Sequence, residues 1–416
     1  MDRSFYIQKR NEFFNKLPNK SIAIIHSGIT QYTSLDGEYP FEVDRNFFYF
    51  TGIAVPDMKL LLTKAENTSI ATLCIPRIDP AKEKWIGKFF TKDDCRTASG
   101  IENIIFIDEL DDFIYALVNA NRVDKCFLYT DNIKLGRPQT INNLMFRSIT
   151  QKYPLIEIKD LNTLTHLMRT LKTDEEIDVM RQAATITNAA IAEAMKNIKP
   201  GIFEYEVQAC FEYVVKRRGG KPAFNTIAAS GSNSVTLHYT ANSQPMQDGD
   251  LLLLDCGASF GWYNADVTRT FPVNGKFTER QLEIYNIVLN ANKYIISQVK
   301  PGLTTLHLNN LLIAFYQKEL KAIGLITEDE EVSQYYYHGV SHSLGLDTHD
   351  VFDKNIALEA GAVITVEPGL YIEKYGFGIR IEDDVLVTAK GCEVLTSEII
   401  KEPSEIEEAM NVWEVK

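Results

Sequence analysis

The sequence predicts a two-domain protein of the α/β (α+β) class, whose second domain contains an internal pseudo-twofold duplication. Its 416 residues exceed what one hydrophobic core usually organises. Over residues 1–170, short apolar runs alternate with helical stretches, a pattern typical of a sheet covered by helices. Over residues 171–416, one arrangement of acids and glycines occurs twice. We therefore expect a domain boundary near residue 171.

The N-terminal domain, residues 1–170, is expected to contain a central sheet built from apolar runs. Its sequence contains neither a cluster of metal ligands nor a phosphate-binding glycine loop. We therefore expect a structural and oligomerisation role, with control of substrate access as the alternative. The apolar runs are residues 21–25, 47–50, 59–62, 70–75, 104–107 and 126–129.

Two similar pairs of helices are predicted in the second domain. Thr173 with Glu176, and Thr278 with Gln281, each form the pattern of a capping box that begins a helix. Apolar residues at helical spacing follow each box, and a Lys-Pro-Gly sequence separates the two helices of each pair. The predicted helices cover residues 175–198, 205–218, 279–299 and 304–322.

The duplicated segments carry acids at the ends of predicted strands. A run of four leucines ends at Asp255, and the chain returns through turn-forming residues to Asp266. The second copy has Glu367, and strand periodicity alone leaves Glu382 and Asp384 as competing fourth members. Four carboxylates in one cavity would repel each other until some were protonated, unless cations neutralised them. Oxygen ligands with one imidazole suit divalent ions such as Mn²⁺, Mg²⁺, Co²⁺ or Zn²⁺.

Histidines supply the remaining candidate ligands. Three of the 7 histidines, His338, His342 and His349, lie within twelve residues between the two acidic segments, and His238 precedes the first. A single histidine is more often structural than functional, but a cluster beside duplicated acids favours a site. On the strands, Thr268 is two residues from Asp266, so its side chain should share the acid's face and orient ligand carboxylates.

These motifs resemble the metallopeptidase family with the pita-bread fold, which includes methionine aminopeptidases, prolidases and aminopeptidase P. The chain is most similar to the bacterial aminopeptidase P (Xaa-Pro aminopeptidase) group. The resemblance is strong over residues 165–400 and weaker over residues 44–52. It rests on Asp255-x-Gly, Tyr263-x-Ala-Asp266-x-Thr-Arg, His338-Gly-x-Ser-His342, Gly345-Leu-x-x-His349-Asp, Glu367-Pro-Gly-Leu-Tyr371 and Gly378-x-Arg380-x-Glu382-Asp.

The resemblance implies a centre of two divalent metal ions. It selects Glu382 over Asp384, and it implies that Asp266 and Glu382 bridge the two ions. Mn²⁺ is the expected metal, although Co²⁺ and Zn²⁺ accept the same ligands. The implied ligands are Asp255, Asp266, His342, Glu367 and Glu382.

The resemblance also implies roles in hydrolysis by a metal-bridging hydroxide. Glu367 would carry the proton from water to the leaving nitrogen. His238 and His349 would donate hydrogen bonds to the carbonyl oxygen or the oxyanion. The pocket for the proline ring would be formed by His338, Tyr371 and Arg380.

The expected activity is therefore release of the N-terminal residue from peptides with proline in the second position. A prolidase acting on Xaa-Pro dipeptides is the first alternative, and a non-catalytic binding relative of the same fold is the second. All five ligand positions are filled, which disfavours the binding relative and metal-free, creatinase-like hydrolysis. The long N-terminal domain disfavours methionine aminopeptidase. A homodimer or homotetramer is what the family suggests.

Composition limits the partners. A net charge of -13 disfavours nucleic acids and anionic membranes but permits a peptide substrate. No apolar run approaches the roughly 18 residues of a membrane span, and no secretory signal is recognisable. The 6 cysteines contain no Cys-x-x-Cys motif, which suits a reducing compartment. We expect a cytoplasmic enzyme.

Overall fold

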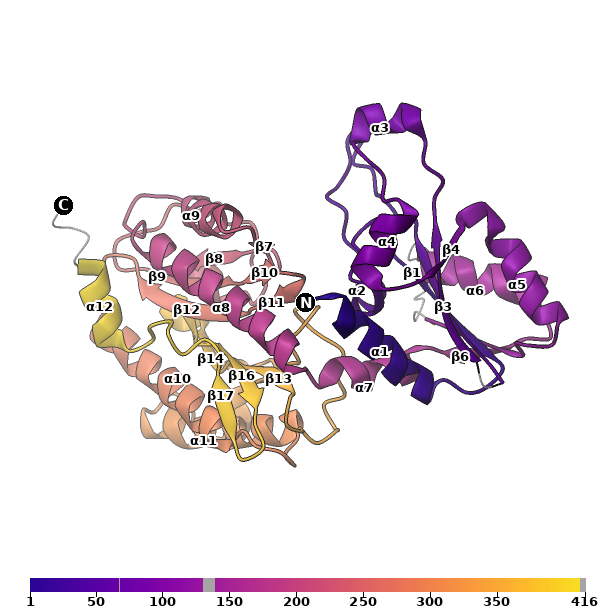
Figure 1. The fold of residues 1–416 in the computed structure, drawn as a ribbon. Coiled ribbons are helices and arrows are strands. Elements are labelled where there is room, and N and C mark those ends of the chain that lie inside the picture. The colour runs from indigo at the N-terminus through magenta and orange to yellow at the C-terminus, as the bar shows by residue number, and fades with distance from the viewer. Residues whose placement is uncertain (67, 130–138, 412–416) are drawn as a thin grey trace. The chain divides into compact units, whose positions relative to one another are not determined.

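The structure is a computed structural model that describes residues 1–411 except residues 67 and 130–138. The chain divides into two compact units, Met1–Met168 and Arg169–Lys416. Both units mix helices and strands (Figure 1). Each unit is described below by itself.

The N-terminal unit contains a six-stranded mixed sheet in the order β4-β3-β2-β1-β5-β6. In it, β1 pairs antiparallel with β2 and parallel with β5. Five of the predicted apolar runs form β1 to β5, whereas β6, an edge strand with alternating exposed residues, was not predicted. The strands are β1 (Ser21–His26), β2 (Lys59–Ala65), β3 (Thr68–Ile75), β4 (Asn103–Phe106), β5 (Lys125–Leu128) and β6 (Glu157–Asp160).

The apolar run at residues 47–50 is not a strand but part of helix α2 (Arg45–Thr51), so this prediction was wrong. The Asp44 carboxylate accepts hydrogen bonds from the backbone N–H groups of Asn46 and Phe47, which caps the helix. Gly52 ends it in the left-handed conformation. The aromatic residues are buried on all sides, so they show no amphipathic period. The other helices here are α1 (Arg3–Lys16), α3 (Pro80–Ile86), α4 (Lys92–Ser99), η1 (Ile107–Glu109), α5 (Leu110–Asn119), α6 (Ile141–Lys152) and α7 (Asn162–Thr170).

The helices of the C-terminal unit follow the predicted pairs. Both predicted capping boxes are present: Thr173 and Glu176 begin α8, and Thr278 and Gln281 begin α10. In Figure 1, strands of this unit lie between the pair α8 and α9 and the pair α10 and α11. The helices are α8 (Asp174–Met195), α9 (Glu204–Arg217), η2 (Gly231–Val235), α10 (Glu279–Gln298), α11 (Thr305–Ala322), η3 (Asp329–Gln334), η4 (Glu373–Tyr375) and α12 (Pro403–Asn411).

The strands of this unit repeat one arrangement. β9 and β12 pair antiparallel with the hairpin β10–β11 between them in sequence, and β13 and β16 pair antiparallel with the hairpin β14–β15 between them. The predicted duplication is therefore present as strand, hairpin, strand in each half. The strands are β7 (Lys221–Pro222), β8 (Ile227–Ser230), β9 (Leu251–Cys256), β10 (Ala258–Phe260), β11 (Tyr263–Asn264), β12 (Val267–Pro272), β13 (Val363–Val366), β14 (Gly369–Ile372), β15 (Phe377–Arg380), β16 (Asp383–Val387) and β17 (Cys392–Val394).

One hydrophobic core joins the two halves of the C-terminal unit. The leucines of β9 are buried, and three of them pack in this core with residues of α8, α10 and α11. Ile379 and Ile381, which alternate with Arg380 and Glu382 along the chain, are also in this core. Strands buried on both faces need few polar side chains, so the acids at their ends stand out as exceptions.

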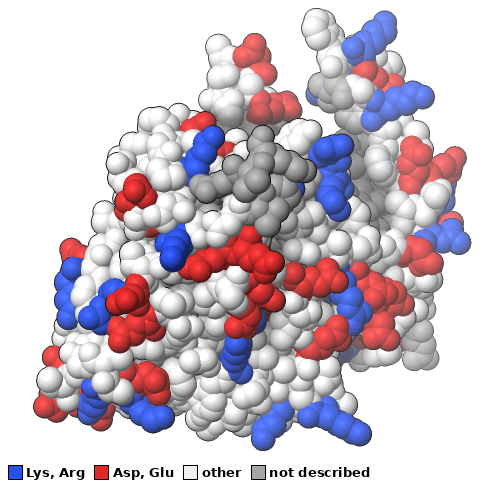
Figure 2. Space-filling view, turned by 90° about the vertical axis from the view of Figure 1, so that its left-hand side faces the viewer, with Lys and Arg blue, Asp and Glu red and all other residues white. Residues whose placement is uncertain are grey.

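The charge on the surface and the composition of the helices are relevant to nucleic acids and membranes as possible partners. The described part of the face shown in Figure 2 carries acidic side chains gathered near its middle, with basic ones scattered around them. It lacks the continuous basic surface that nucleic acids require. Among the described residues, no helix has the length and apolar composition needed to cross a membrane.

Candidate metal centre and active site

The four predicted acids lie at corresponding places in the two halves. Asp255 is in β9, and Asp266 directly precedes β12, the antiparallel partner of β9. Glu367 lies between β13 and β14, and Glu382 lies between β15 and β16. The fold brings the four acids close together. As a result, the charge of each one raises the pKa of at least one other.

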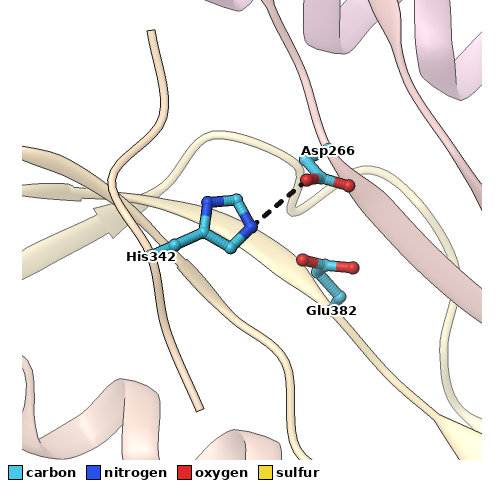
Figure 3. Close-up of side chains that lie close together, drawn as sticks. All are labelled: Asp266, His342 and Glu382. Carbon is cyan, nitrogen blue, oxygen red and sulfur yellow. Dashed lines mark ion pairs between the residues drawn. The ribbon is translucent and has the colours of Figure 1, made fainter. Parts of the chain in front are cut away.

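The centre of this cluster is formed by Asp266, His342 and Glu382, which can each offer a ligand atom within 4.8 Å of the others (Figure 3). His342 Nε2 lies 3.4 Å from Oδ2 of Asp266 and 3.7 Å from Oε1 of Glu367. Nδ1 of His342 lies 3.0 Å from the carbonyl oxygen of Ser343, an arrangement that leaves Nε2 directed at the acids.

Burial and mutual repulsion disfavour the charged forms of these acids. Burial, followed by the charges of Asp255 and Glu367, raises the pKa of Asp266 well above its usual range. Burial, followed by the charges of Asp266 and Asp255, does the same to the pKa of Glu382. Burial and then Glu382 raise the pKa of Glu367 to about 8. Cations bound among them would reverse this balance and keep the carboxylates ionised.

Asp255 provides an independent test of whether a cation fits. Its Oδ2 accepts a hydrogen bond from Arg380 Nη2 at 2.6 Å. Its Oδ1 is buried and has no hydrogen-bond partner. A buried carboxylate oxygen without a donor is costly, and a metal ion would satisfy it. The donor set of carboxylate oxygens and one imidazole nitrogen therefore fits hard or borderline divalent ions.

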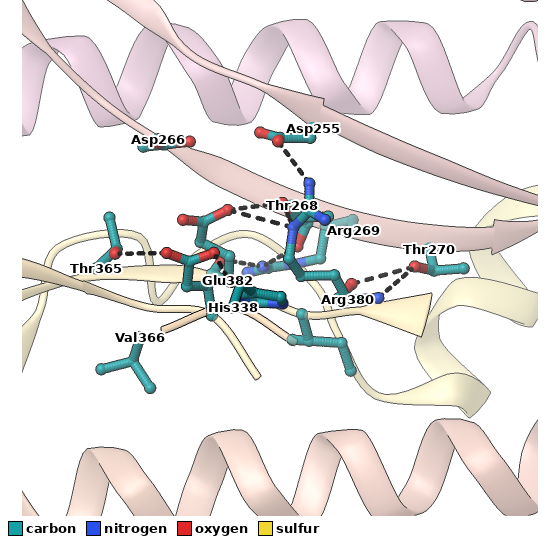
Figure 4. Close-up of polar contacts among 12 residues, drawn as sticks. Asp255, Asp266, Thr268, Arg269, Thr270, His338, Thr365, Val366, Arg380 and Glu382 are labelled. Atoms are coloured by element: carbon teal, nitrogen blue, oxygen red, sulfur yellow. Dashed lines mark hydrogen bonds and ion pairs between the residues drawn. The ribbon is translucent and has the colours of Figure 1, made fainter. Parts of the chain in front are cut away.

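Thr268 and Arg380 connect the acids to each other (Figure 4). The Thr268 hydroxyl donates to Oε2 of Glu382 at 2.6 Å and accepts from Arg380 Nε at 2.9 Å. Arg380 also donates to Asp255 and, through Nη1, to the Tyr371 hydroxyl at 2.9 Å. The structure thus places both side chains among the acids, as strand periodicity predicted for Thr268.

Asp384, the competing candidate ligand, lies behind the cluster. Its carboxylate accepts from the backbone N–H of Asp266 at 3.2 Å. It is absent from the group of ligand atoms that includes Glu382. Asp384 therefore orients the backbone of Asp266 in this structure.

A buried ion pair on the opposite strand face was missed by the sequence analysis. Arg269 Nη2 donates to Asp383 Oδ1 at 2.7 Å, and both side chains are fully buried. Arg269 Nη1 also donates to the carbonyl oxygen of Glu382 at 2.6 Å, so the pair fixes the backbone beside a predicted ligand. Burial alone would raise the pKa of Asp383, but Arg269 and Lys401 outweigh it and hold the pKa at about 2. The signal was the charged residue at 269, on the face expected to pack in the core.

His338 and Tyr371 form one wall beside Glu367. His338 Nε2 lies 2.8 Å from the Tyr371 hydroxyl, and its Nδ1 lies 3.6 Å from Oε2 of Glu367. Burial, followed by the charge of Arg380, lowers the pKa of His338 to about 4. His338 is therefore neutral at pH 7.

His349 and His238 reach the cluster from two other segments. The rings of His349 and His342 lie 4.2 Å apart between centroids. Burial, then the charges of His342 and His238, lowers the pKa of His349. The β-branched and aromatic residues around His238 predict a strand, but His238 lies in a turn after η2, because glycine and polar residues precede it. Besides burial, electrostatic interaction with His238 lowers the pKa values of both His338 and His349, so His238 lies near these two residues.

Comparison with known families gives this geometry its context. The sequence model described as "Metallopeptidase family M24" matches residues 178–389, just over half of the chain. The chain belongs to metallopeptidase family M24. A second model, "Aminopeptidase P, N-terminal domain", matches residues 6–127 of this M24 chain.

Individual relatives span the whole M24 chain. The Xaa-Pro aminopeptidase of Escherichia coli strain K12 is 35% identical over 99% of this chain and 98% of its own length. A solved structure of a Bacillus anthracis protein is 42% identical, with a TM-score of 0.96 over 99% of both chains. The zinc-substituted Escherichia coli aminopeptidase P in complex with product is 33% identical, with a TM-score of 0.91 over 99% of both chains. The predicted fold class, an N-terminal α/β domain and a pita-bread domain, is confirmed.

Proposed function

We propose that this M24 metallopeptidase is an Xaa-Pro aminopeptidase, which releases the N-terminal residue from peptides whose second residue is proline. The observation that carries the proposal is the grouping of Asp266, His342 and Glu382, with Asp255 and Glu367 beside them. The likeness to the Escherichia coli Xaa-Pro aminopeptidase over nearly the full length of both chains supports the substrate class.

The residues that would hold two divalent ions are the five predicted ligands. When bound, such ions acidify water and polarise a carbonyl group. Mn²⁺ is our first choice, with Co²⁺ and Zn²⁺ as alternatives, because the same donors suit all three. Asp266 and Glu382 would bridge the ions. The ligands are Asp255, Asp266, His342, Glu367 and Glu382.

The acids of the cluster differ in their exposure to solvent, and this difference indicates which of them can transfer a proton. The side chain of Glu367 is 17% exposed, against 6% for Asp266 and 3% for Glu382. Glu367 can therefore exchange a proton with water and pass it to the leaving nitrogen. His349, whose ring contacts that of His342, and His238, which lies near His349, would donate hydrogen bonds to the substrate carbonyl oxygen or the oxyanion.

His338, Tyr371 and Arg380 would form the wall of the proline pocket. Their mutual hydrogen bonds fix the three side chains before a substrate arrives. An Xaa-Pro bond has no N–H group, so this wall needs no hydrogen-bond acceptor for the nitrogen of that bond. The neutral His338 ring can pack against the flat proline ring.

A panel of peptides on chelated protein tests the proposal. Xaa-Pro-Yaa tripeptides, Xaa-Pro dipeptides and Xaa-Ala-Yaa tripeptides are compared with Mn²⁺, Co²⁺ or Zn²⁺ added back. We expect fast release of the first residue from Xaa-Pro-Yaa alone. Faster cleavage of the dipeptides would make the protein a prolidase. Tight peptide binding without cleavage under any metal would favour the non-catalytic relative, which the retained ligand geometry disfavours.

The domain roles are also proposals. We infer that residues 1–170 form a structural and oligomerisation domain, with control of substrate access as the alternative, and that residues 171–416 form the catalytic domain of a homodimer or homotetramer. Light scattering coupled to size-exclusion chromatography measures the oligomer. The cytoplasmic location inferred from the sequence stays a prediction.

A further inference from the structure

Glu204, the first residue of α9, is a buried carboxylate outside the acid cluster. Its Oε1 accepts from the backbone N–H of Ser230 at 2.8 Å, the Ser230 hydroxyl at 2.7 Å and Asn233 Nδ2 at 2.9 Å. Its Oε2 accepts from the Tyr239 hydroxyl at 2.8 Å and the backbone N–H of Gln244 at 3.0 Å. Among the described residues, no lysine or arginine pairs with it. Five hydrogen-bond donors, aided by the start of a helix, thus hold a buried negative charge.

All five donors belong to one segment, residues 230–244. One carboxylate oxygen holds the start of this segment at Ser230, and the other holds its end at Gln244. The chain between these two points has no strand of its own and consists of η2, a turn and an irregular stretch. Its backbone therefore depends on side-chain contacts for a fixed position.

This segment carries His238, next to the Tyr239 that Glu204 holds. Its middle part contacts the wall of the site: the Ser234 hydroxyl accepts from the backbone N–H of Gly378 at 2.6 Å, and the Tyr337 hydroxyl donates to the Val235 carbonyl at 2.6 Å. His238 itself is exposed and lies near His338 and His349 of the site. Because Glu204 holds the adjacent Tyr239 and both ends of the segment, it restricts where His238 can lie.

The duplication shows that the fold does not require a carboxylate at this position. Gly201 and Gly302 are equivalent glycines of the two Lys-Pro-Gly sequences, so Glu204 corresponds to Thr305, the first residue of α11. Thr305 is also buried, but it is neutral. Histidines of the site follow this helix in both halves, but only the first half begins the helix with an acid.

We propose that Glu204 is a positioning residue of the peptidase reaction, which sets His238 against the substrate carbonyl by holding both ends of residues 230–244. The inference rests on the proposed function, because that function gives His238 its role.

A double-mutant cycle tests the proposal. Glu204→Gln keeps the shape but turns one acceptor into a donor that faces other donors, so the segment should shift. We expect kcat on an Xaa-Pro-Yaa peptide to fall at least about tenfold, since small misplacements are costly, with metal content unchanged. In a His238→Ala background, Glu204→Gln should cause little further loss. Equal losses in both backgrounds would show a general structural effect and overturn the proposal.

Glu206→Gln is the matched control. Glu206 lies in the same first turn of α9, is exposed, and accepts from the backbone N–H of Phe203. Its replacement should leave kcat and the segment unchanged. If Glu204→Gln does not fold, Tyr239→Phe removes one of the five hydrogen bonds and leaves the carboxylate intact. Tyr239→Phe should then lower kcat in the wild-type background by less than Glu204→Gln would. It should cause little further loss in the His238→Ala background.

Amide hydrogen exchange of the metal-free protein separates this inference from the proposed function. The amides of residues 231–244 should exchange faster in Glu204→Gln than in wild type or Glu206→Gln. Unchanged exchange in all three would overturn the anchoring role. Faster exchange in a protein that cleaves no Xaa-Pro peptide would instead refute the proposed function and confine Glu204 to ordering the segment.

Discussion

Glu382 and Asp383 are neighbours in the chain and both are buried, yet their environments are opposite. Asp383 meets Arg269, Lys401 and the Thr396 hydroxyl, and its pKa lies at about 2. Glu382 accepts from the Thr268 hydroxyl and faces other acids, so its pKa is raised well above its usual range. Burial opposes the charge in both cases. Only the partners differ.

This contrast separates two clusters: the one around Asp383 contains enough positive charge for its acid, whereas the one formed by Asp255, Asp266, Glu367 and Glu382 does not. The Asp383 cluster contains its own cations, so it holds strands β12 and β16 together without help. The acid cluster contains one arginine for four acids and leaves a buried oxygen of Asp255 without a donor. Its missing positive charge must come from outside the chain, and divalent metal ions supply it.

Removal of metal by chelation should have the largest effect, and it should affect the acid cluster but not the Asp383 cluster. Removal of metal should abolish peptidase activity, because only the acid cluster depends on added cations. The fold should persist, because the Asp383 cluster and the hydrophobic core do not need metal. Activity and circular dichroism are measured on the same chelated sample, before and after metal is restored. Simultaneous loss of activity and secondary structure would contradict the distinction.

Asp266→Asn should have the next largest effect. It removes a negative charge and an expected bridging ligand, so the metal content should fall from two ions per chain. Activity should fall about a thousandfold, since metal stabilisation of the transition state amounts to several kcal/mol. Elemental analysis and kcat measure these losses, with the exposed Asp248→Asn as the control. Two tightly held ions in Asp266→Asn would assign the bridge to another residue.

Asp383→Asn tests the complete cluster. It leaves the buried cation of Arg269 without its charge partner, so the free energy of unfolding should fall by about 3–5 kcal/mol. The exposed pair Arg181–Glu393 is the control, and Glu393→Gln should cost less than about 1 kcal/mol. Urea unfolding monitored in the C-terminal unit compares them. Equal losses would show that burial adds nothing to the Arg269–Asp383 pair.

The pH dependence of the metal-free protein tests the acid cluster from the side of stability. Glu367 titrates at about 8 in the folded state, above its ordinary value of 4.5. The folded state then binds more protons than the unfolded state between these values, so stability should fall as pH rises from 4.5 to 8. Bound metal should remove this trend. Melting temperatures at pH 5, 6.5 and 8, with and without Mn²⁺, measure it; a parallel trend in both forms would speak against Glu367 as its source.

Local patterns predicted the parts of the site that repeat. The duplication located Asp255 and Glu367 because each follows a recognisable glycine and apolar run, and Asp266 was located because the chain returns to it through turn-forming residues. Capping boxes located the starts of α8 and α10 because their signal lies within four residues. The choice between Glu382 and Asp384 needed the family resemblance, since both share one strand face.

Other features depend on contacts that no short pattern contains. The aromatic run of α2 suggested a strand by composition, whereas its caps at Asp44 and Gly52 decide for a helix. Asp383 lies 114 residues from Arg269, and no local pattern connects residues so far apart. The role of Glu204 depends on Tyr239 and Gln244, which only the folded chain brings to α9.

Arg380 has a consequence for how the site responds to its ligands. One guanidinium group holds Asp255, a proposed metal ligand, and Tyr371, which belongs to the proposed proline pocket. A shift of Arg380 on metal binding therefore also moves a side chain of the pocket. In the same way, a shift of Arg380 on peptide binding moves a side chain among the proposed metal ligands. Thermodynamic reciprocity then requires that the factor by which metal tightens the binding of a proline peptide equals the factor by which that peptide tightens the binding of metal.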